Sequence, residues 1–231
     1  MHVPDGFINA PVSLGAGVVA AAGVAICLRG ARRELDDRTA PLAGLTAAFV
    51  FAAQMLNFPV AAGTSGHLLG GTLAAILVGP YTGVLCVSVV LVVQALLFAD
   101  GGLTALGVNI TVMALVTVLV GYGLSRLLLR VLPRSRATAS AASFVAALVS
   151  VPASALAFTG IYALGGTTDV PLGTVAAAMV GVHVLIGIGE AAITMVTVSS
   201  VLAVRPDLVY AARGRLRPLV LKNAGPVGAS A

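Results

Sequence analysis

Long apolar stretches, separated by short breaks rich in glycine, proline or polar residues, run through most of this chain. One stretch covers residues 11–28, four lie between residues 39 and 125, and two lie between residues 137 and 204. A helix needs about 20 apolar residues to cross a bilayer, and the segment 67–80 is the shortest of the seven. The pattern therefore predicts an all-α, polytopic integral membrane protein with seven transmembrane helices.

The breaks carry residues that interrupt helices. Three of them divide residues 39–125, namely "NFPVAAGTSG" (57–66), "GPYTG" (79–83) and "ADGG" (99–102). A fourth, "GGTTDVP" (165–171), separates the last two apolar stretches. Because glycine and proline favour turns, each break is expected to connect two successive helices.

The composition supports a membrane location. The chain has 231 residues, of which 59% are hydrophobic and 9% charged. A soluble domain this apolar has too few polar side chains to cover its surface, so most of the protein must face lipid. Cys27 and Cys86 lie inside apolar stretches, without the spacing of a metal site or a disulfide framework, and are expected to pack as small apolar residues.

Positive charges gather in three clusters between the apolar blocks. Their members are Arg29, Arg32, Arg33 and Arg38; Arg126, Arg130, Arg134 and Arg136; and Arg205, Arg213, Arg215, Arg217 and Lys222. Such clusters follow the positive-inside rule of membrane proteins, and no nucleic-acid partner is expected. If all three clusters are cytoplasmic, an even number of helices must separate each successive pair. This agrees with the four apolar stretches between the first and second clusters and the two between the second and third. The expected topology is N-out/C-in, with a short N-terminal segment (1–10), a transmembrane domain (11–204) and a basic cytoplasmic tail (205–231).

The opening sequence, "MHVPDGF", has the donor atoms of a chelate. It lacks the basic start of a signal peptide, so Met1 is expected to remain, with a free α-amine on the outer side. This amine, the amide nitrogen of His2 and its Nδ1 close two fused chelate rings. Three coplanar nitrogens suit Ni(II) or Cu(II), which favour tetragonal nitrogen sites. The alternative is an incidental histidine on an exposed tail.

A fourth nitrogen is available at His67, in "NFPVAAGTSGHLLGG" (57–71). The expected topology places this stretch on the outer side, with the N-terminus, and its glycines allow a second backbone to approach closely. Asp5, Asn57 and Ser65 are candidates for orienting the imidazoles, because polar partners usually surround metal-bound histidines. The alternative role for this histidine is to cap the entrance of a helix.

Four stretches of the chain resemble the signature sequences of the CbiM/NikM family, the substrate-capture (S) components of cobalt and nickel energy-coupling-factor transporters. They are "MHVPDGFIN", "FAAQMLNFPVAAGTSGHLLGG", "QALLFADGGLTALGVN" and "GVHVLIGIGEAAIT". The likeness runs from residue 1 to about residue 208, and Val3 and Ile8 replace the commoner Ile and Leu. The resemblance implies seven helices with the N-terminus outside. It also implies a square-planar site of four nitrogens from Met1, His2 (amide and imidazole) and His67.

The resemblance further implies a substrate-specificity subunit that captures Ni2+ or Co2+ from the outer side, in the inner (plasma) membrane of a prokaryote. The implied partners are a transmembrane T component, two ATPase subunits and often a small auxiliary membrane subunit. The chain has no G-x-x-x-x-G-K-[ST] motif, so it is not expected to be an enzyme and ATP hydrolysis falls to the partners. Nickel and cobalt stay open as alternatives, because the same motif serves both branches of the family.

Two other functions are open to the sequence. His183 and Glu190 lie seven residues apart on one face of the last helix, where they either relay protons in a stand-alone metal carrier or support the site and the packing. "GTSG" (63–66) matches the G-x-S-G pattern of rhomboid intramembrane proteases, with Ser65 as nucleophile. Four further polar residues in apolar stretches are expected to form interhelical hydrogen bonds: Gln54, Gln94, Asp100 and Asn109.

Overall fold

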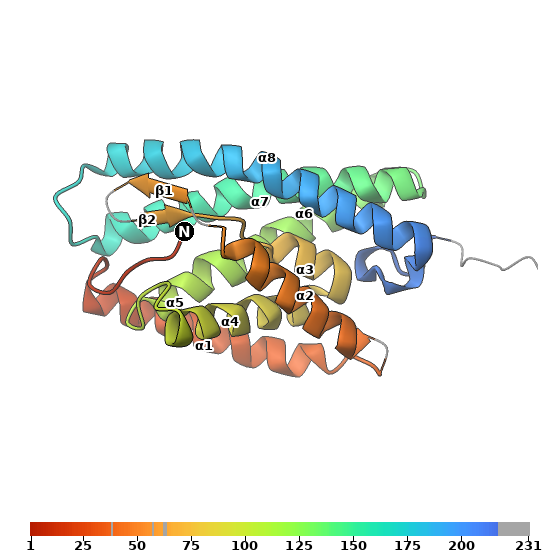
Figure 1. Cartoon of the computed structure of the whole chain (residues 1–231), viewed down its shortest axis with the longest axis horizontal. Coiled ribbons are helices and arrows are strands. Elements are labelled where there is room, and N and C mark those ends of the chain that lie inside the picture. The colour runs from red at the N-terminus through yellow and green to blue at the C-terminus, as the bar shows by residue number, and fades with distance from the viewer. Residues whose placement is uncertain (38, 57, 62–63, 217–231) are drawn as a thin grey trace, which may run out of the picture.

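The protein is a bundle of helices that run along a common long axis (Figure 1). The computed structural model describes residues 1–37, 39–56, 58–61 and 64–216. The helices are α1 (Ala10–Ala31), α2 (Thr39–Gln54), α3 (Gly71–Val78), α4 (Pro80–Leu97), α5 (Leu106–Asn109), α6 (Thr117–Val131), α7 (Arg136–Gly165) and α8 (Leu172–Val204). A π-helical segment (Ile110–Val116) joins α5 to α6, and two 3-10 turns (Pro206–Leu208 and Tyr210–Ala212) follow α8.

Five of the described helical stretches are long and apolar enough to cross a membrane. They are α1, α4, the continuous stretch Leu106–Val131, α7 and α8. The two other expected crossings correspond to α2, which has 16 residues, and α3, which has 8. At 1.5 Å per residue, α3 is about 12 Å long, less than half of the hydrocarbon thickness. All seven apolar stretches thus contain a helix, whereas the helix of the third stretch is too short to span a bilayer by itself.

The break between α3 and α4 depends on a glycine in an unusual conformation. Gly79 has φ +101°, and a Cβ there would lie 2.5 Å from the carboxyl carbon of Glu34. The buried Glu34 carboxylate accepts hydrogen bonds from the backbone N–H groups of Tyr81 (3.2 Å) and Thr82 (2.7 Å). It therefore occupies the position of a helix cap at the start of α4.

Two of the expected breaks have defined structures. Within 57–66, β1 (Phe58–Ala61) and β2 (Thr64–Gly66) form an antiparallel pair, which lies beside α8 (Figure 1). The break at 165–171 turns the chain from α7 into α8. The sequence predicted both interruptions but not the strands.

The N-terminal segment folds back into the bundle (Figure 1). Ile8 forms an isolated β-bridge with Gly166, and Asn9 caps α1 by accepting a hydrogen bond from the N–H of Val12. Before these residues the chain makes a turn at Pro4, whose carbonyl accepts a hydrogen bond from the N–H of Phe7 at 3.4 Å. These contacts direct the first three residues into the core of the bundle, where all three are buried.

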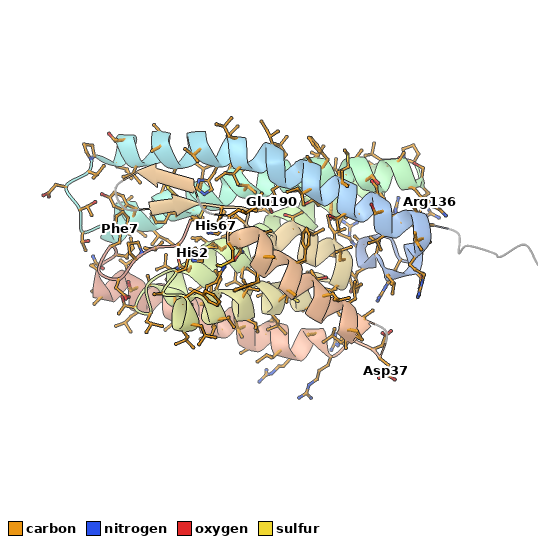
Figure 2. All side chains as sticks on the ribbon, viewed as in Figure 1. His2, Phe7, Asp37, His67, Arg136 and Glu190 are labelled. Carbon is orange, nitrogen blue, oxygen red and sulfur yellow. The ribbon has the colours of Figure 1, made fainter. Side chains whose placement is uncertain are left out.

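The basic residues and the N-terminal segment lie at different ends of the molecule. Phe7 is near one end, whereas Asp37 and Arg136 mark the other (Figure 2). The second and third basic clusters meet there, around a cavity of about 990 Å³ lined by Arg134, Arg136, Arg213 and Arg215. Arg38, Arg217 and Lys222 lie outside the described residues.

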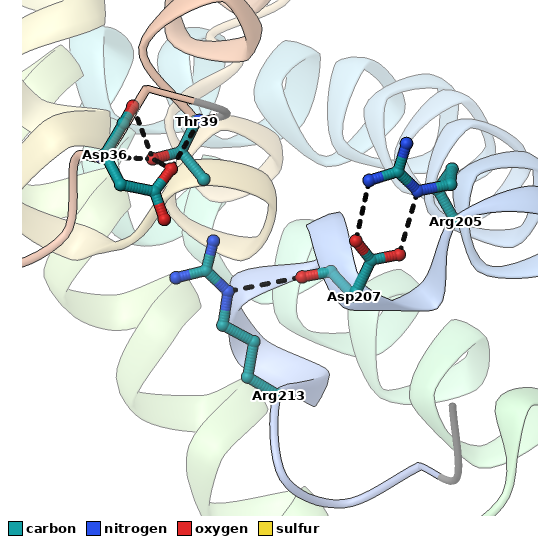
Figure 3. Close-up of polar contacts among 5 residues, drawn as sticks. All are labelled: Asp36, Thr39, Arg205, Asp207 and Arg213. Carbon is teal, nitrogen blue, oxygen red and sulfur yellow. Dashed lines mark hydrogen bonds and ion pairs between the residues drawn. The ribbon is translucent and has the colours of Figure 1, made fainter. Parts of the chain in front are cut away.

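Polar contacts connect residues at the start of α2 and in the segment that follows α8 (Figure 3). Thr39 and Asp36 exchange hydrogen bonds at the start of α2. Arg205 forms a two-pronged ion pair with Asp207, whose backbone carbonyl also accepts from Arg213. Because such pairs are exposed, they contribute little to stability and mainly order the segment after α8.

Candidate metal centre

Met1 lies in the interior of the bundle, with an exposed fraction of 1%. Its Sδ accepts a hydrogen bond from the hydroxyl of Ser154 on α7. Burial lowers the pKa of the α-amino group from 8.0 to about 4, although the charge of Asp100 acts in the opposite direction. At neutral pH this amine is therefore uncharged, with a lone pair available to a metal ion.

His2 is buried beside the amine and stacks against His67. The two ring centroids are 4.5 Å apart, and the ring planes differ by 28°. Burial, followed by the charge of the α-amine, lowers the pKa of His2 to about 4, with Asp100 opposing the shift. The Nε2 atom lies 3.6 Å from a carboxylate oxygen of Asp100. The His2 imidazole is thus uncharged at neutral pH, as a metal ligand must be.

His67 is fully buried, in the connection between β2 and α3. Its Nδ1 lies 2.7 Å from the carbonyl oxygen of Leu68. Since a carbonyl only accepts, Nδ1 carries the proton and Nε2 the lone pair. Burial lowers the pKa of His67 well below 6.5, and the charges of the α-amine and His2 act in the same direction. Within the described part of the chain this Nε2 has no hydrogen-bond partner, which is costly for a buried nitrogen unless it binds something else.

The structure therefore brings together the three residues that the sequence singled out: Met1, His2 and His67. Among the described residues, no group of three or more His, Cys, Asp or Glu side chains is arranged to hold a metal ion. A site built on the amine and amide of the first two residues does not need such a group, because two of its four nitrogens are backbone atoms.

Asn109 holds the N-terminal segment in place. Its Oδ1 accepts from the N–H of Val3 at 2.9 Å, and its Nδ2 donates to the Val3 carbonyl at 3.4 Å. The same carbonyl accepts from the N–H of Gly102 at 2.8 Å. The sequence predicted an interhelical hydrogen bond for Asn109, whereas the structure places it on the backbone next to His2.

Of the three residues expected to orient the imidazoles, the structure describes the side-chain contacts of Asp5. The Asp5 carboxylate accepts from the backbone N–H (2.7 Å) and the hydroxyl (2.6 Å) of Thr104, which lowers the pKa of Asp5. Asp5 therefore fastens the N-terminal turn to the loop after α4. Asn57 and the side chain of Ser65 lie outside the described part of the structure. The carboxylate beside the His2 ring belongs to Asp100.

An open cavity of about 310 Å³ leads to the His2 ring. Its lining includes His2, Asp5 and Asp100. Two carboxylates at this opening favour the approach of a cation.

His183 and Glu190 have different partners, although both are buried on α8. The Nδ1 of His183 lies 2.7 Å from the carbonyl of Met179 in its own helix, and its Nε2 has no hydrogen-bond partner in the described part. The carboxylate of Glu190 instead accepts from the N–H groups of Leu69 (2.6 Å) and Gly70 (3.0 Å). Glu190 thus contacts the connection that carries His67.

Known proteins similar to this chain are concerned with metal transport. The family model described as cobalt uptake substrate-specific transmembrane region matches residues 2–208. A Haloquadratum walsbyi protein, provisionally named a metal transport protein, is 41% identical over 210 residues, covering 91% of this chain and 94% of the relative. An Archaeoglobus fulgidus protein, provisionally named the fused nickel transport protein NikMN, is 40% identical over 225 residues. The match covers 96% of this chain and 72% of the relative. A crystal structure described as a transition metal transporter is similar with a TM-score of 0.80 at 30% identity, covering 88% of this chain and 93% of the other.

Proposed function

Since this chain belongs to the CbiM family of cobalt uptake substrate-specific transmembrane regions, we propose that it is the substrate-specificity (S) subunit of an ATP-driven energy-coupling-factor importer. The chain is a cobalt/nickel transport protein of the CbiM/NikM type. The ion it captures is Ni2+ or Co2+, taken from the outer side of the membrane. A partner T component and two ATPase subunits, with or without a small auxiliary membrane subunit, drive its release into the cytoplasm.

The proposed site is square-planar and has four nitrogens. They are the α-amine of Met1, the amide nitrogen and Nδ1 of His2, and Nε2 of His67. The observation that carries this proposal is the burial of Met1 and His2 together with the stacking of the His2 ring on His67, whose Nε2 has no hydrogen-bond partner among the described residues. Because the Nδ1 of His67 is engaged by the carbonyl of Leu68, Nε2 is the nitrogen left to bind the ion.

We propose the N-out/C-in orientation on the basis of the positions of the charges. Arg134, Arg136, Arg213 and Arg215 surround one cavity, and Arg136 lies at the end of the bundle away from Phe7 (Figure 2). By the positive-inside rule this end is cytoplasmic. The cavity lined by Asp5 and Asp100 then faces the outside, the side from which the ion arrives. In this arrangement residues 1–10 bind the metal, residues 11–204 form the membrane domain and residues 205–231 form the cytoplasmic tail.

Neither of the other functions is favoured. The relatives carry names of metal transport rather than proteolysis, which argues against Ser65 as a nucleophile. A proton relay through His183 and Glu190 is not supported either, because the Glu190 carboxylate is bound to the backbone of Leu69 and Gly70.

The test is to extend the chain by two alanines before Met1 and to measure Ni2+ and Co2+ binding by calorimetry. Two residues are added because a single one would make the histidine the third residue, and the amine, two amide nitrogens and the imidazole would then form a new four-nitrogen chelate. The longer extension removes the α-amine from its ring with the His2 amide, so high-affinity binding is expected to disappear. A matched control carries the two extra alanines after Ala231. Equal affinities of the two proteins would refute the chelate.

Transport is tested separately, by metal uptake in cells that also contain the partner subunits. Uptake is expected to stop when the ATPases are inactivated. Uptake that continues without them and follows the proton gradient would instead support a stand-alone carrier.

A further inference from the structure

The connection that carries His67 is held from two sides by buried side chains. Glu190 of α8 accepts the N–H groups of Leu69 at 2.6 Å and Gly70 at 3.0 Å. Gln54 of α2 donates from Nε2 to the carbonyl of Leu69 at 2.8 Å. Three backbone groups within three residues of His67 are therefore fixed by two different helices.

We propose that Glu190 is a positioning residue for the metal ligand His67, an inference that rests on the function proposed above. Its carboxylate fixes the backbone from which the imidazole projects. The side chain is 2% exposed, and ionisable groups at such depth in a membrane protein are costly and usually functional. A carboxylate offers two oxygens, one for each N–H, whereas a neutral amide side chain offers one.

The start of α3 shows why this support is needed. Gly70 precedes the helix with φ +75°, and no side chain from its own segment caps the first turn. A Cβ at Gly70 would lie 2.8 Å from methyl groups of Val50, so the backbone passes through a narrow space between α2 and α8. Glu190 supplies from α8 the acceptors that a local cap normally provides.

Geometry makes His67 the ligand that depends most on the fold. The other three nitrogens belong to two adjacent residues, and their positions are fixed relative to one another by the chelate rings. His67 must bring its Nε2 into the plane of those three from a separate segment. Binding geometries tolerate displacements of only about 0.5 Å, so a small shift of Leu69 and Gly70 is enough to weaken the fourth bond.

The chain contains a matched control in Glu34. This buried carboxylate also accepts two backbone N–H groups, those of Tyr81 and Thr82, at the start of a helix. It follows α1, near Asp37, at the end of the bundle away from His67 (Figure 2). Replacing either glutamate by glutamine disturbs the same kind of helix cap, but only one of the caps adjoins the proposed site.

The experiment compares wild type, Glu190→Gln and Glu34→Gln as full chains with an untagged N-terminus, in detergent. The Ni2+ affinity and the visible absorption band of the bound ion are measured for each. For Glu190→Gln we expect affinity to fall about 10- to 100-fold, the usual effect of losing a partner that orients a metal ligand. At saturating Ni2+ its band is expected to move to longer wavelength, because water replaces the imidazole. Glu34→Gln is expected to lower the melting temperature while leaving affinity and band unchanged.

The outcomes separate the two proposals. A wild-type protein without the band of four-nitrogen nickel overturns the proposed site. A wild-type band that persists in Glu190→Gln, with an affinity equal to that of Glu34→Gln, overturns the role of Glu190 alone. If Glu190→Gln does not fold, Glu190→Asp takes its place: it keeps both acceptor oxygens on a shorter side chain. The same shift in band and affinity, in reduced degree, is expected, and wild-type values would refute the proposal.

Discussion

Replacing Asn109 by leucine tests whether seating of the N-terminal segment is coupled to metal binding. Asn109 makes two hydrogen bonds to the backbone of Val3, at 2.9 and 3.4 Å, and both residues are buried. Leucine has a similar volume but accepts no hydrogen bond, so the Val3 N–H is left without its acceptor. The Val3 carbonyl keeps its bond from the N–H of Gly102 at 2.8 Å. The substitution therefore leaves one buried donor unsatisfied.

An unsatisfied buried donor costs about 1–3 kcal/mol. At 1.4 kcal/mol per factor of ten, this corresponds to an affinity about 5- to 140-fold lower. This loss applies in full if the segment leaves the core in the metal-free protein, because the free state then escapes the cost and the bound state does not. If the segment stays in the core without metal, both states carry the cost and the affinity does not change.

Calorimetry with Ni2+ on the full chain measures the effect. A suitable control is Thr46→Val on α2, which removes a hydroxyl that bonds within its own helix to the carbonyl of Leu42. Thr46→Val is expected to bind nickel as wild type does. If Asn109→Leu also binds within twofold of wild type, then the hydrogen bonds to Val3 do not hold the ligands in place, and the coupling argument fails.

Three further outcomes are expected. Burial lowers the pKa of the Met1 α-amine and of His2 to about 4, so at about pH 7 both are uncharged, and only the His2 amide gives up a proton to the metal. Calorimetry in buffers of different ionisation enthalpy should find that about one proton is released per metal ion bound. The affinity should accordingly rise about tenfold per pH unit. Release of two or more protons per ion would contradict the lowered pKa values of Met1 and His2. Asp5→Asn removes a charge from the cavity beside His2 but keeps an oxygen for Thr104. Stopped-flow measurements should show metal association slowed about two- to fivefold at low ionic strength and unchanged at high salt, whereas a salt-independent effect would refute electrostatic attraction. A chain acetylated on Met1 should lose high-affinity Ni2+ binding in equilibrium dialysis, and full binding would exclude the amine as a ligand.

The sequence predicted much of the helical architecture because the apolar stretches and the breaks are distinct. The break at Gly79 and Pro80 was readable, since glycine and proline there have defined conformational roles. The length of α3 was not readable in the same way. All eight of its residues are buried, so no polar face marks where the helix begins, and the preceding hairpin was hidden in a segment that reads as a turn.

The proposed ligands were predictable because histidines are rare in this chain, which has three. Their supporting partners were not. Asn109 and Glu190 stood out as polar residues in apolar helices, but their partners are backbone groups 106 and about 120 positions away. Backbone N–H and carbonyl groups are the same at every position. A sequence therefore shows that such a side chain needs a partner, but not which segment supplies it.

The burial of residues 1–3 has a consequence for biosynthesis. The Met1 side chain contacts Ser154, 153 positions later, and Val3 contacts Asn109. At about 5–20 residues per second, a ribosome needs about 8–30 seconds to add that many residues. Residues 1–3 thus wait for α7 before their binding place exists, and His67 waits still longer for Glu190. The proposed site combines residues that are made early with partners that are made late, so it is among the last parts of the protein to be assembled.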